Sequence, residues 1–532
     1  MFPRFPAVIT LVCLFCLILL SGCVDSAQNP AYTAPNANVP AGETDAGDIG
    51  PVIEDFDAYS EQIFEKSGVP GMAVAVVKDD AVIYLRCFGV KNITTREPVT
   101  PHTRFQLASV SKSFTSATIA SLVGEGELSW DDEVTSLNPA FQLSDPWVSE
   151  QVTIRDLLSH RTGLPEYGGD DLQHLGFNRS EIIHQLRYVP LTGEFRSSYG
   201  YSNIGITSAA EAAAAKTGTQ WEDLIAERIF IPAGMTNTSA RFIDFETAAD
   251  RVDTYPVTNG TPTPGPFFND DVNTAAGGVS STITDMTRYL RLQLGGGSID
   301  GVQVIDARAL QETHSPQNIK RFGNDSIDMY ALGWEFIAED GRVRVEHGGD
   351  LTSGVSTYVT LWPDENMGIV VLTNGFPGGF ILKKGVISAW DDLYFTGAIQ
   401  TDGYAEAEAA INAAMQPGAS QISPFDVLPS APAGADAAPA RPLDAYTGSY
   451  TQDYFGTVRV ETNDTGDGLL LYAGHLTEPF VLAPYDGDTF VETESRTAVE
   501  FIADESGGAI ERLHVAMLDE PWMDAVFVRI PS

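Results

Sequence analysis

The sequence predicts an α+β fold in which an antiparallel sheet is flanked by helices, followed by a small all-β domain. Strand-like apolar runs occur at about 71–90 and again at about 345–374, and helical patterns dominate from about 109 to 310. Strands that come from both ends of a helical region favour one sheet covered by helices. After about residue 442, short strand-like runs alternate with Gly, Asn and Asp, which favours a sandwich or a small barrel.

Length and composition limit the classes of protein to consider. The chain has 532 residues, enough for two or three domains at roughly 100–200 residues each. With 43% hydrophobic and 10% aromatic residues it can bury substantial cores. The formal net charge is −41, which argues against nucleic acid as a partner because phosphate binding needs clustered Lys and Arg. We attribute the charge to an acidic, well-solvated surface.

Residues 1–23 are predicted to be a lipoprotein signal peptide. The apolar run "VITLVCLFCLILL" has 13 residues, which is short for a membrane span and typical of a signal-peptide core. It leads into "LSGC", which resembles a lipobox, so we expect Cys23 to be lipidated and the protein to be held on the outer side of the cell membrane. Ordinary secretion and an uncleaved anchor are the alternatives.

Four segments follow the signal peptide. Residues 24–50 are rich in Ala, Pro, Asn and Gly and predict a flexible tether, and residues 51–400 hold the main domain. Residues 401–441 contain a short helix and a Pro/Ala-rich linker, and residues 442–532 form the β domain. Outside the signal peptide the cysteine is Cys87, so no internal disulfide is expected, and its strand-like surroundings indicate a core position.

The stretch "FQLASVSKSFTS" places Ser109 and Lys112 three residues apart, on one face of a helix. A serine hydroxyl is a weak nucleophile until a neighbouring base takes its proton. A lysine can be that base when burial lowers its pKa. The spacing alone is equally compatible with a helix N-cap followed by a surface lysine.

Other stretches extend this pattern in a fixed order. They are "PVTPHTRFQLASVSKSFTS", "TIRDLLSHRTGLP", "YGYSNIGI", "IFIPAGMTNTS", "AAGGVSSTITDM", "YALGW" and "VEHGGD". Together they resemble the class C β-lactamase and penicillin-binding-protein-like serine hydrolases over roughly residues 53–400. The resemblance implies a β-lactamase/transpeptidase-like sheet with a helical subdomain and a site in the cleft between them.

The resemblance also implies roles for individual residues. Ser109 matches the acylated nucleophile, and Lys112 matches the residue that holds or relays its proton. Tyr201 matches the tyrosine of the second motif, which can act as general base if nearby cations lower its pKa. Asn203 is expected to bond Lys112 and a substrate amide. The backbone N–H groups of Ser109 and Asp350 would form the oxyanion hole.

The third motif departs from the family pattern. His347, Gly348 and Gly349 match a strand at the edge of the cleft, where the glycines would let a substrate backbone lie against it. Related β-lactamases usually have a lysine in place of His347, and a histidine is only partly charged near neutral pH. We therefore expect His347 to face the carboxylate or carbonyl end of a substrate, and esterase or peptidase activity as readily as β-lactamase activity. His160 matches a structural turn.

Several other chemistries lack their motifs. The sequence has no His-Glu-x-x-His or Gly-x-Ser-x-Gly pattern, and none of the form Cys-x-x-Cys outside the signal peptide, so we expect no metal, no cofactor and no α/β-hydrolase fold. The β domain resembles the lipocalin-like barrel that some of these hydrolases carry; it could shape substrate access or assembly, or be a passive module. The sequence is compatible with a homo-oligomer and does not specify the oligomeric state.

The leading hypothesis is an extracytoplasmic serine hydrolase that forms an acyl-enzyme with peptide, amide or ester substrates, including peptides that contain D-amino acids. Alternatives are a carboxylesterase, a penicillin-binding or sensing protein that is acylated but turns over slowly, and a scaffold with an inactive hydrolase domain.

Overall fold

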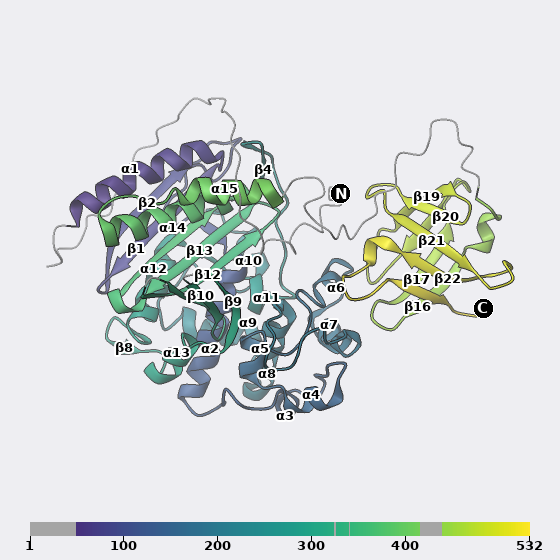
Figure 1. The fold of residues 1–532 in the computed structure, drawn as a ribbon, viewed down its shortest axis with the longest axis horizontal. Helices are drawn as coiled ribbons and strands as arrows, with labels where there is room; N and C mark the ends of the chain where they lie inside the picture. Colours follow the sequence, from purple (N-terminus) through teal and green to yellow (C-terminus); the bar gives the residue numbers. More distant parts are fainter. Residues whose placement is uncertain (1–48, 324–325, 340, 415–438, 532) are drawn as a thin grey trace.

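The computed structural model describes residues 49–323, 326–339, 341–414 and 439–531. Its largest unit is an antiparallel sheet of eight strands in the order β2-β1-β14-β13-β12-β11-β10-β9 (Figure 1). These strands are β1 (Gly71–Lys78), β2 (Ala81–Gly89), β9 (Asn318–Phe322), β10 (Ser326–Tyr330), β11 (Glu335–Glu339), β12 (Arg342–Leu351), β13 (Val355–Trp362) and β14 (Met367–Thr373). The predicted hairpin at 71–90 is β1 and β2, and the predicted strands at 345–374 are β12 to β14.

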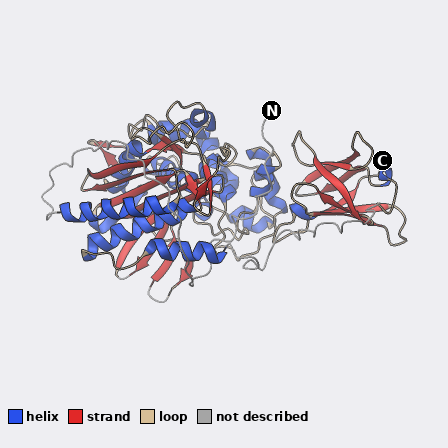
Figure 2. Ribbon diagram, turned by 90° about the horizontal axis from the view of Figure 1, so that it is seen from above, coloured by secondary structure: helices blue, strands red, loops and turns tan. Residues whose placement is uncertain are grey.

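Both faces of the sheet are covered by helices. This is required because successive side chains of β1 point to opposite faces and nearly all of them are apolar and buried. Met72, Val74 and Val76 belong to a core that includes α1 (Gly50–Ser67), α14 (Gly378–Thr396) and α15 (Gly403–Ala414). The residues between them belong to the opposite core, with α2 (Ser111–Gly124) and α12 (Ile283–Leu294). Figure 2 shows helices on the two sides of the sheet. Helix α15 is the short helix predicted at 404–415.

A helical subdomain lies beside the sheet, between α2 and the barrel (Figure 1). Helix α2 is buried on nearly every side, which is the pattern of a central helix. The subdomain helices and their neighbours are α3 (Val134–Leu137), α4 (Pro146–Gln151), α5 (Ile154–Leu158), α6 (Asp170–His174), α7 (Arg179–Gln185), α8 (Asn203–Thr217), α9 (Trp221–Ile225), α10 (Phe242–Glu246), α11 (Thr274–Gly277) and α13 (Ala307–Thr313).

Side-chain caps fix the helices that carry the site. The Ser202 hydroxyl accepts a hydrogen bond from the Gly205 amide and begins α8 directly before Asn203. Thr153 and Asp156 form a reciprocal capping box at the start of α5. Short strands β3 (Arg104–Gln106) and β6 (Ser280–Thr282) pair with each other ahead of α2. The other short strands are β4 (Tyr255–Thr258), β5 (Thr261–Pro262), β7 (Ser298–Ile299), β8 (Val302–Gln303) and β15 (Gly375–Phe376).

The C-terminal domain is a closed antiparallel barrel in which each strand pairs with the next and the last pairs with the first. Closure leaves no exposed sheet edge, and its interior is filled by aromatic rings such as Tyr446, Phe490 and Phe501. The strands are β16 (Gly448–Gln452), β17 (Gly456–Thr462), β18 (Leu469–Tyr472), β19 (Phe480–Asp486), β20 (Thr489–Glu492), β21 (Ala498–Ala503), β22 (Ile510–Val515) and β23 (Val526–Arg529). Of the two all-β architectures predicted, the barrel is the one present.

Some predicted features lie outside the described residues. These are the signal peptide with Cys23, most of the 24–50 tether, and the linker over 415–438. In the part of the chain that the structure describes, no helix has the length and apolarity needed to cross a membrane. Cys87 lies in β2, and burial raises the pKa of its thiol to about 12, so it is an unreactive packing residue as predicted.

Candidate active site

Ser109 lies in a single 3-10 turn, Ala108–Val110, between β3 and α2. The residue before it, Ala108, has φ +48°, a left-handed conformation that costs energy for a residue with a Cβ. The turn is held from outside, because the hydroxyl of Thr357 on β13 donates to the Leu107 carbonyl at 2.6 Å. Ser109 remains half-buried and reaches solvent, whereas Lys112, one turn along, is fully buried.

Lys112 has three oxygen neighbours. Its Nζ lies 3.0 Å from the Ser109 Oγ, 2.6 Å from the Asn203 Oδ1 and 3.0 Å from the Ala276 carbonyl oxygen. The two carbonyl-type oxygens only accept, so they take two of the amine's hydrogens. Burial lowers the pKa of Lys112 to about 7, against the opposing charges of Asp170 and Asp270. A neutral amine therefore has its lone pair left for the Ser109 hydroxyl.

Tyr201 approaches Ser109 from the other side. Its hydroxyl donates to the Ser109 Oγ at 2.8 Å, and the Lys112 Nζ lies 4.6 Å from the centre of its ring. The condition for a general base, a pKa lowered by nearby cations, is not met. Burial raises the pKa of Tyr201, and the negative charges of Glu335 and Asp170 add to that rise. Tyr201 is thus a proton donor to Ser109, and Lys112 is the group whose pKa suits a base.

Asn203 connects Lys112 to a buried carboxyl group. Its Oδ1 accepts from Lys112, as predicted, and its Nδ2 donates to the Asp170 Oδ2 at 2.5 Å. Burial raises the pKa of Asp170 to about 7. The side-chain amide thus bonds to a protein group at each end.

The end of β12 lies against the turn that carries Ser109. A Cβ on Gly349 would clash with the Leu107 carbonyl and lie 2.9 Å from the Ser109 amide nitrogen. A Cβ on Gly348 would lie 2.9 Å from the Tyr358 ring. Packing within the protein therefore requires glycine at both positions. The sequence alone predicts a different reason for these glycines, contact with a substrate backbone.

The same strand end offers a backbone edge to a substrate. In the described strands, β11 pairs with β12 no further than Glu346, so residues 347–351 have a strand partner, β13, on one side. Gly349 lies against the Ser109 turn, and Asp350 is the next residue of the strand; the oxyanion hole of the Ser109 and Asp350 amides stays a prediction. The Asp350 carboxylate points the other way and pairs with Lys383 of α14, whose Nζ lies 2.7 and 2.8 Å from its two oxygens.

His347 lies on the predicted edge strand, β12, but its side chain is buried and not open to a substrate as expected. Its side chain is 2% exposed, its Nδ1 lies 2.7 Å from the Gly348 carbonyl oxygen, and its Nε2 lies 2.9 Å from the Tyr330 hydroxyl. A carbonyl accepts only, so Nδ1 carries the proton and Nε2 accepts from Tyr330. Burial, helped by the charge of Lys112, lowers the pKa of His347 to about 3. The ring is a neutral wall residue and carries no charge with which to bind a substrate carboxylate.

His160 supports the second motif from behind. Its Nδ1 accepts from the Ser202 amide at 3.2 Å, and its ring centre lies 4.7 Å from that of Tyr201. Burial lowers its pKa well below the usual value, so it stays neutral. This is a structural role, as the motif resemblance implies.

Sequence reasoning missed the buried charges around the site. Asp170 and Asp270 set the electrostatics of Lys112, and Lys383 pairs with the side chain of Asp350. Asp170 lies shortly after the quoted "GLP", but a carboxylate in a Gly-rich loop is an ordinary surface pattern. Lys383 is followed by another lysine, which gave no indication of burial.

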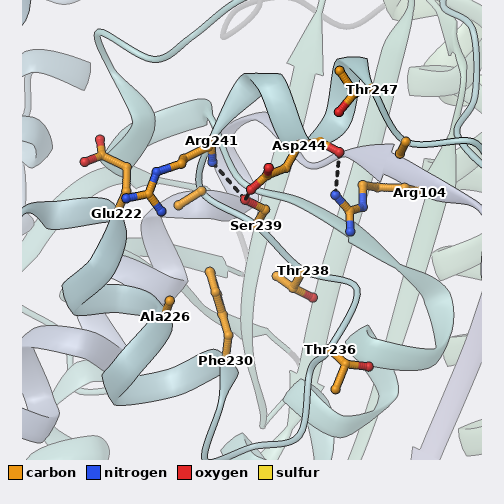
Figure 3. A pocket seen from close by; sticks show the side chains of 12 residues that line it. Arg104, Glu222, Ala226, Phe230, Thr236, Thr238, Ser239, Arg241, Asp244 and Thr247 are labelled. Carbon is orange, nitrogen blue, oxygen red and sulfur yellow. Dashed lines mark hydrogen bonds between the residues drawn. The ribbon is translucent and has the colours of Figure 1, made fainter.

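A separate polar pocket of 420 Å³ lies between α9 and α10 (Figure 3). Its two arginines are engaged within the protein, since Arg104 donates to the Asp244 carbonyl and Arg241 to the Asp223 carboxylate. Ser109 is not among its lining residues. The pocket is therefore distinct from the Ser109 site. In the described part of the chain, no group of His, Cys, Asp and Glu could hold a metal ion.

The Ser109–Lys112–Tyr201–Asn203 arrangement agrees with a family model described as beta-lactamase, which matches residues 56–387. The chain belongs to the β-lactamase family. A second model, described as a domain of unknown function, matches residues 432–526 and so covers most of the barrel.

Similar proteins include hydrolases and penicillin-binding-protein homologues. The chain is 30% identical over 347 residues to the unguisins hydrolase ungD' of Aspergillus campestris, covering 62% of each protein. It is 26% identical over 324 residues to the protein flp of Staphylococcus aureus, covering 60% of this chain and 63% of that protein. It thus spans about three-fifths of the length of these curated relatives.

Among solved structures, the octameric penicillin-binding protein homologue from Pyrococcus abyssi shares the fold. The TM-score is 0.58 at 20% sequence identity, over 89% of this chain and 99% of that one.

Proposed function

We propose that this protein is a serine hydrolase that acts through an acyl-enzyme on Ser109. The observation that carries the proposal is the position of the Ser109 Oγ, 3.0 Å from the Nζ of a lysine with lowered pKa and 2.8 Å from the hydroxyl of Tyr201. A nucleophile within hydrogen-bond reach of an oriented base is the arrangement that covalent catalysis requires.

The geometry supports a sequence of proton movements. Neutral Lys112 takes the Ser109 proton as Oγ forms a bond to the substrate carbonyl carbon. The negative charge on the carbonyl oxygen is then held by the backbone N–H groups of Ser109 and Asp350. As the bond to the leaving group breaks, Tyr201 gives that group its proton and regains one from Lys112. Water then repeats the attack on the acyl-enzyme and releases the acid.

The substrate class follows from the absence of charge on His347. A neutral ring supplies no fixed cation for a substrate carboxylate, so we propose neutral peptide, amide and ester substrates ahead of β-lactams. Peptides that contain D-amino acids remain within this class. The hydrolase relative of Aspergillus campestris supports hydrolysis. The penicillin-binding protein homologue of Pyrococcus abyssi, which shares the fold, favours the second candidate, a protein that is acylated but turns over slowly.

Location and assembly are proposals of their own. The "LSGC" motif supports a lipid on Cys23 and a position outside the cytoplasm, and mass spectrometry of the mature N-terminus tests it. An N-terminal peptide that begins at Met1 would exclude processing. The octameric state of the Pyrococcus abyssi homologue supports a homo-oligomer here, which light scattering of the purified protein tests.

The nucleophile is tested with a fluorophosphonate probe. We expect the wild type to be labelled and Ser109→Ala to lose both labelling and activity. Ser121→Ala is the matched control, because that buried serine lies on the same helix and its hydroxyl bonds only the Thr118 carbonyl in the described structure. Labelling that survives Ser109→Ala would exclude Ser109 as the nucleophile. A screen with D-amino-acid peptides, short-chain esters and a chromogenic cephalosporin then defines the substrate, and the rate of adduct release separates an enzyme from a slow-turnover binder.

A further inference from the structure

The barrel inserts one tyrosine into the helical subdomain. Tyr454, in the turn between β16 and β17, is fully buried, and its hydroxyl donates to the Asp171 Oδ1 at 2.5 Å. Gln185, the last residue of α7, donates through its Nε2 to the carbonyl oxygens of Asp453 and Tyr454 at 3.1 and 2.7 Å. Figure 1 places the barrel next to α6 and α7. The tyrosine is therefore fixed at a docked surface.

The turn that carries Tyr454 is also held by contacts within the barrel. The Oε1 of Gln452 accepts from the amides of Tyr454 and Phe455 at 2.6 and 2.8 Å. The ring of Trp522 packs edge-on against Tyr454, with ring centres 5.2 Å apart. A turn held in this way places the tyrosine hydroxyl with little further ordering of the chain, so the contact can define the position of Asp171.

From Asp171, a short path leads to the nucleophile. Asp171 and Asp170 are the first two residues of α6, and they follow Gly169, whose φ of +100° turns the chain into the helix. Asp170 accepts from Asn203, and Asn203 accepts from Lys112, which lies 3.0 Å from the Ser109 Oγ. The two carboxyl groups face opposite parts of the protein: one meets the barrel and the other meets the site.

Few other contacts hold these carboxyl groups in place. Asp170 Oδ1 and Asp171 Oδ2 are buried with no hydrogen-bond partner in the described part of the chain. Burial raises the pKa of Asp171 to about 6 and that of Glu520 on the barrel to about 8, and Asp170 and Asp270 are similarly affected. Each of the two carboxyl groups has one side-chain donor, Tyr454 for Asp171 and Asn203 for Asp170, and this donor helps to fix its position beside the backbone amides that Asp171 also bonds.

We propose that Tyr454 of the barrel is a positioning residue for acylation, which holds the Asp170–Asp171 turn so that the Asn203 amide presents its oxygen to Lys112. An Asn side chain that rotates by half a turn would present its NH₂ group to the amine and remove an acceptor. The proposal rests on the proposed function, because it assigns the barrel a part in activating Ser109. Through Tyr454, the barrel affects the rate of acylation although it does not contact the substrate.

The test measures the rate of fluorophosphonate labelling at Ser109 in the full-length protein. We expect Tyr454→Phe, which removes one hydroxyl, to slow labelling by about tenfold, the size of effect that one hydrogen bond to a charged group supports. Tyr446→Phe is the matched control, because its hydroxyl also bonds an aspartate, Asp488, but inside the barrel. We expect the control to label at the wild-type rate. Equal rates for Tyr454→Phe and Tyr446→Phe would overturn the proposal.

A double-mutant cycle separates positioning from general loosening of the fold. If Tyr454 acts through Asn203, then Tyr454→Phe adds little further loss once Asn203→Ala has been made. Full additivity of the two losses would refute the path through Asn203.

Substitutions of Asp171 test the same contact and remain informative if Tyr454→Phe does not fold. Asp171→Ala should slow labelling as Tyr454→Phe does, and Asp171→Asn, which keeps an acceptor for the tyrosine, should lose less. Equal losses for the two variants would contradict the proposal. If wild type itself is not labelled at Ser109, the proposed function fails; if it is labelled but these variants match it, only the positioning role fails.

Discussion

The lowered pKa of Lys112 leads to a definite pH dependence of acylation. With a pKa of about 7, the amine is neutral in about a tenth of molecules at pH 6, about half at pH 7 and about nine-tenths at pH 8. An exposed lysine would be neutral in only about one molecule in 3,000 at pH 7, by the same arithmetic from its usual pKa. Burial therefore raises the concentration of the reactive form by about a thousandfold at neutral pH.

Because neutral Lys112 is the base, the rate of acylation should rise with pH and level off above about pH 8. Removing a nearby negative charge favours the neutral amine, so Asp270→Asn should move the midpoint of this rise to lower pH. The Asp270 carboxyl raises the pKa of Lys112, and an asparagine keeps an oxygen acceptor for the Gln173 amide. This variant changes charge with little change in shape.

The assay is kcat/KM for a neutral ester, or the labelling rate with a neutral fluorophosphonate, between pH 5 and 9. Asp364→Asn is the control, since this aspartate lies in the exposed turn between β13 and β14 and is not among the charges that affect Lys112. A flat wild-type profile, or a midpoint that Asp270→Asn leaves in place or moves upward, would refute the assignment of Lys112 as the base.

Three further predictions concern the other residues of the site. Tyr201→Phe removes the donor to Ser109 and should slow acylation by about 10²–10⁴-fold with an unchanged thermal midpoint, so near-normal turnover would show that the hydroxyl is dispensable. Lys383→Met leaves the Asp350 carboxylate, whose side chain is 32% exposed, without its cation; urea unfolding should show a loss of about 2–4 kcal/mol, and a loss near zero would mean that the pair does not stabilise the strand. Since burial keeps His347 neutral, His347→Gln should leave the pH dependence of the ratio of acid and ester KM values unchanged from pH 5 to 8; a change in that dependence near pH 6.5 would reveal a charged His347.

Local sequence was sufficient for the parts of this protein that depend on neighbouring residues. The three-residue spacing of Ser109 and Lys112 brings them together where the 3-10 turn runs into α2, and the two apolar runs around "KDD" at 78–80 specify a hairpin. The ordered motifs predict that Tyr201 and Asn203 belong to the same site, and both contact Ser109 or Lys112. Short runs separated by Gly, Asn and Asp specified an all-β domain, but they did not distinguish a sandwich from a barrel, because closure depends on the pairing of β16 with β23.

The tertiary structure decided how each of these groups behaves. The pKa values of Lys112, Tyr201 and His347 are set first by burial, which results from the packing of segments hundreds of residues apart. For this reason His347 does not titrate near neutral pH as expected, and the pKa of Tyr201 is not lowered as a general base would require. The contact of Tyr454 with Asp171 joins residues 283 positions apart, and no local pattern encodes it. The sequence by itself determined which chemical groups are present and which of them share a turn of helix. Their protonation states depended on the solvent that the complete fold excludes.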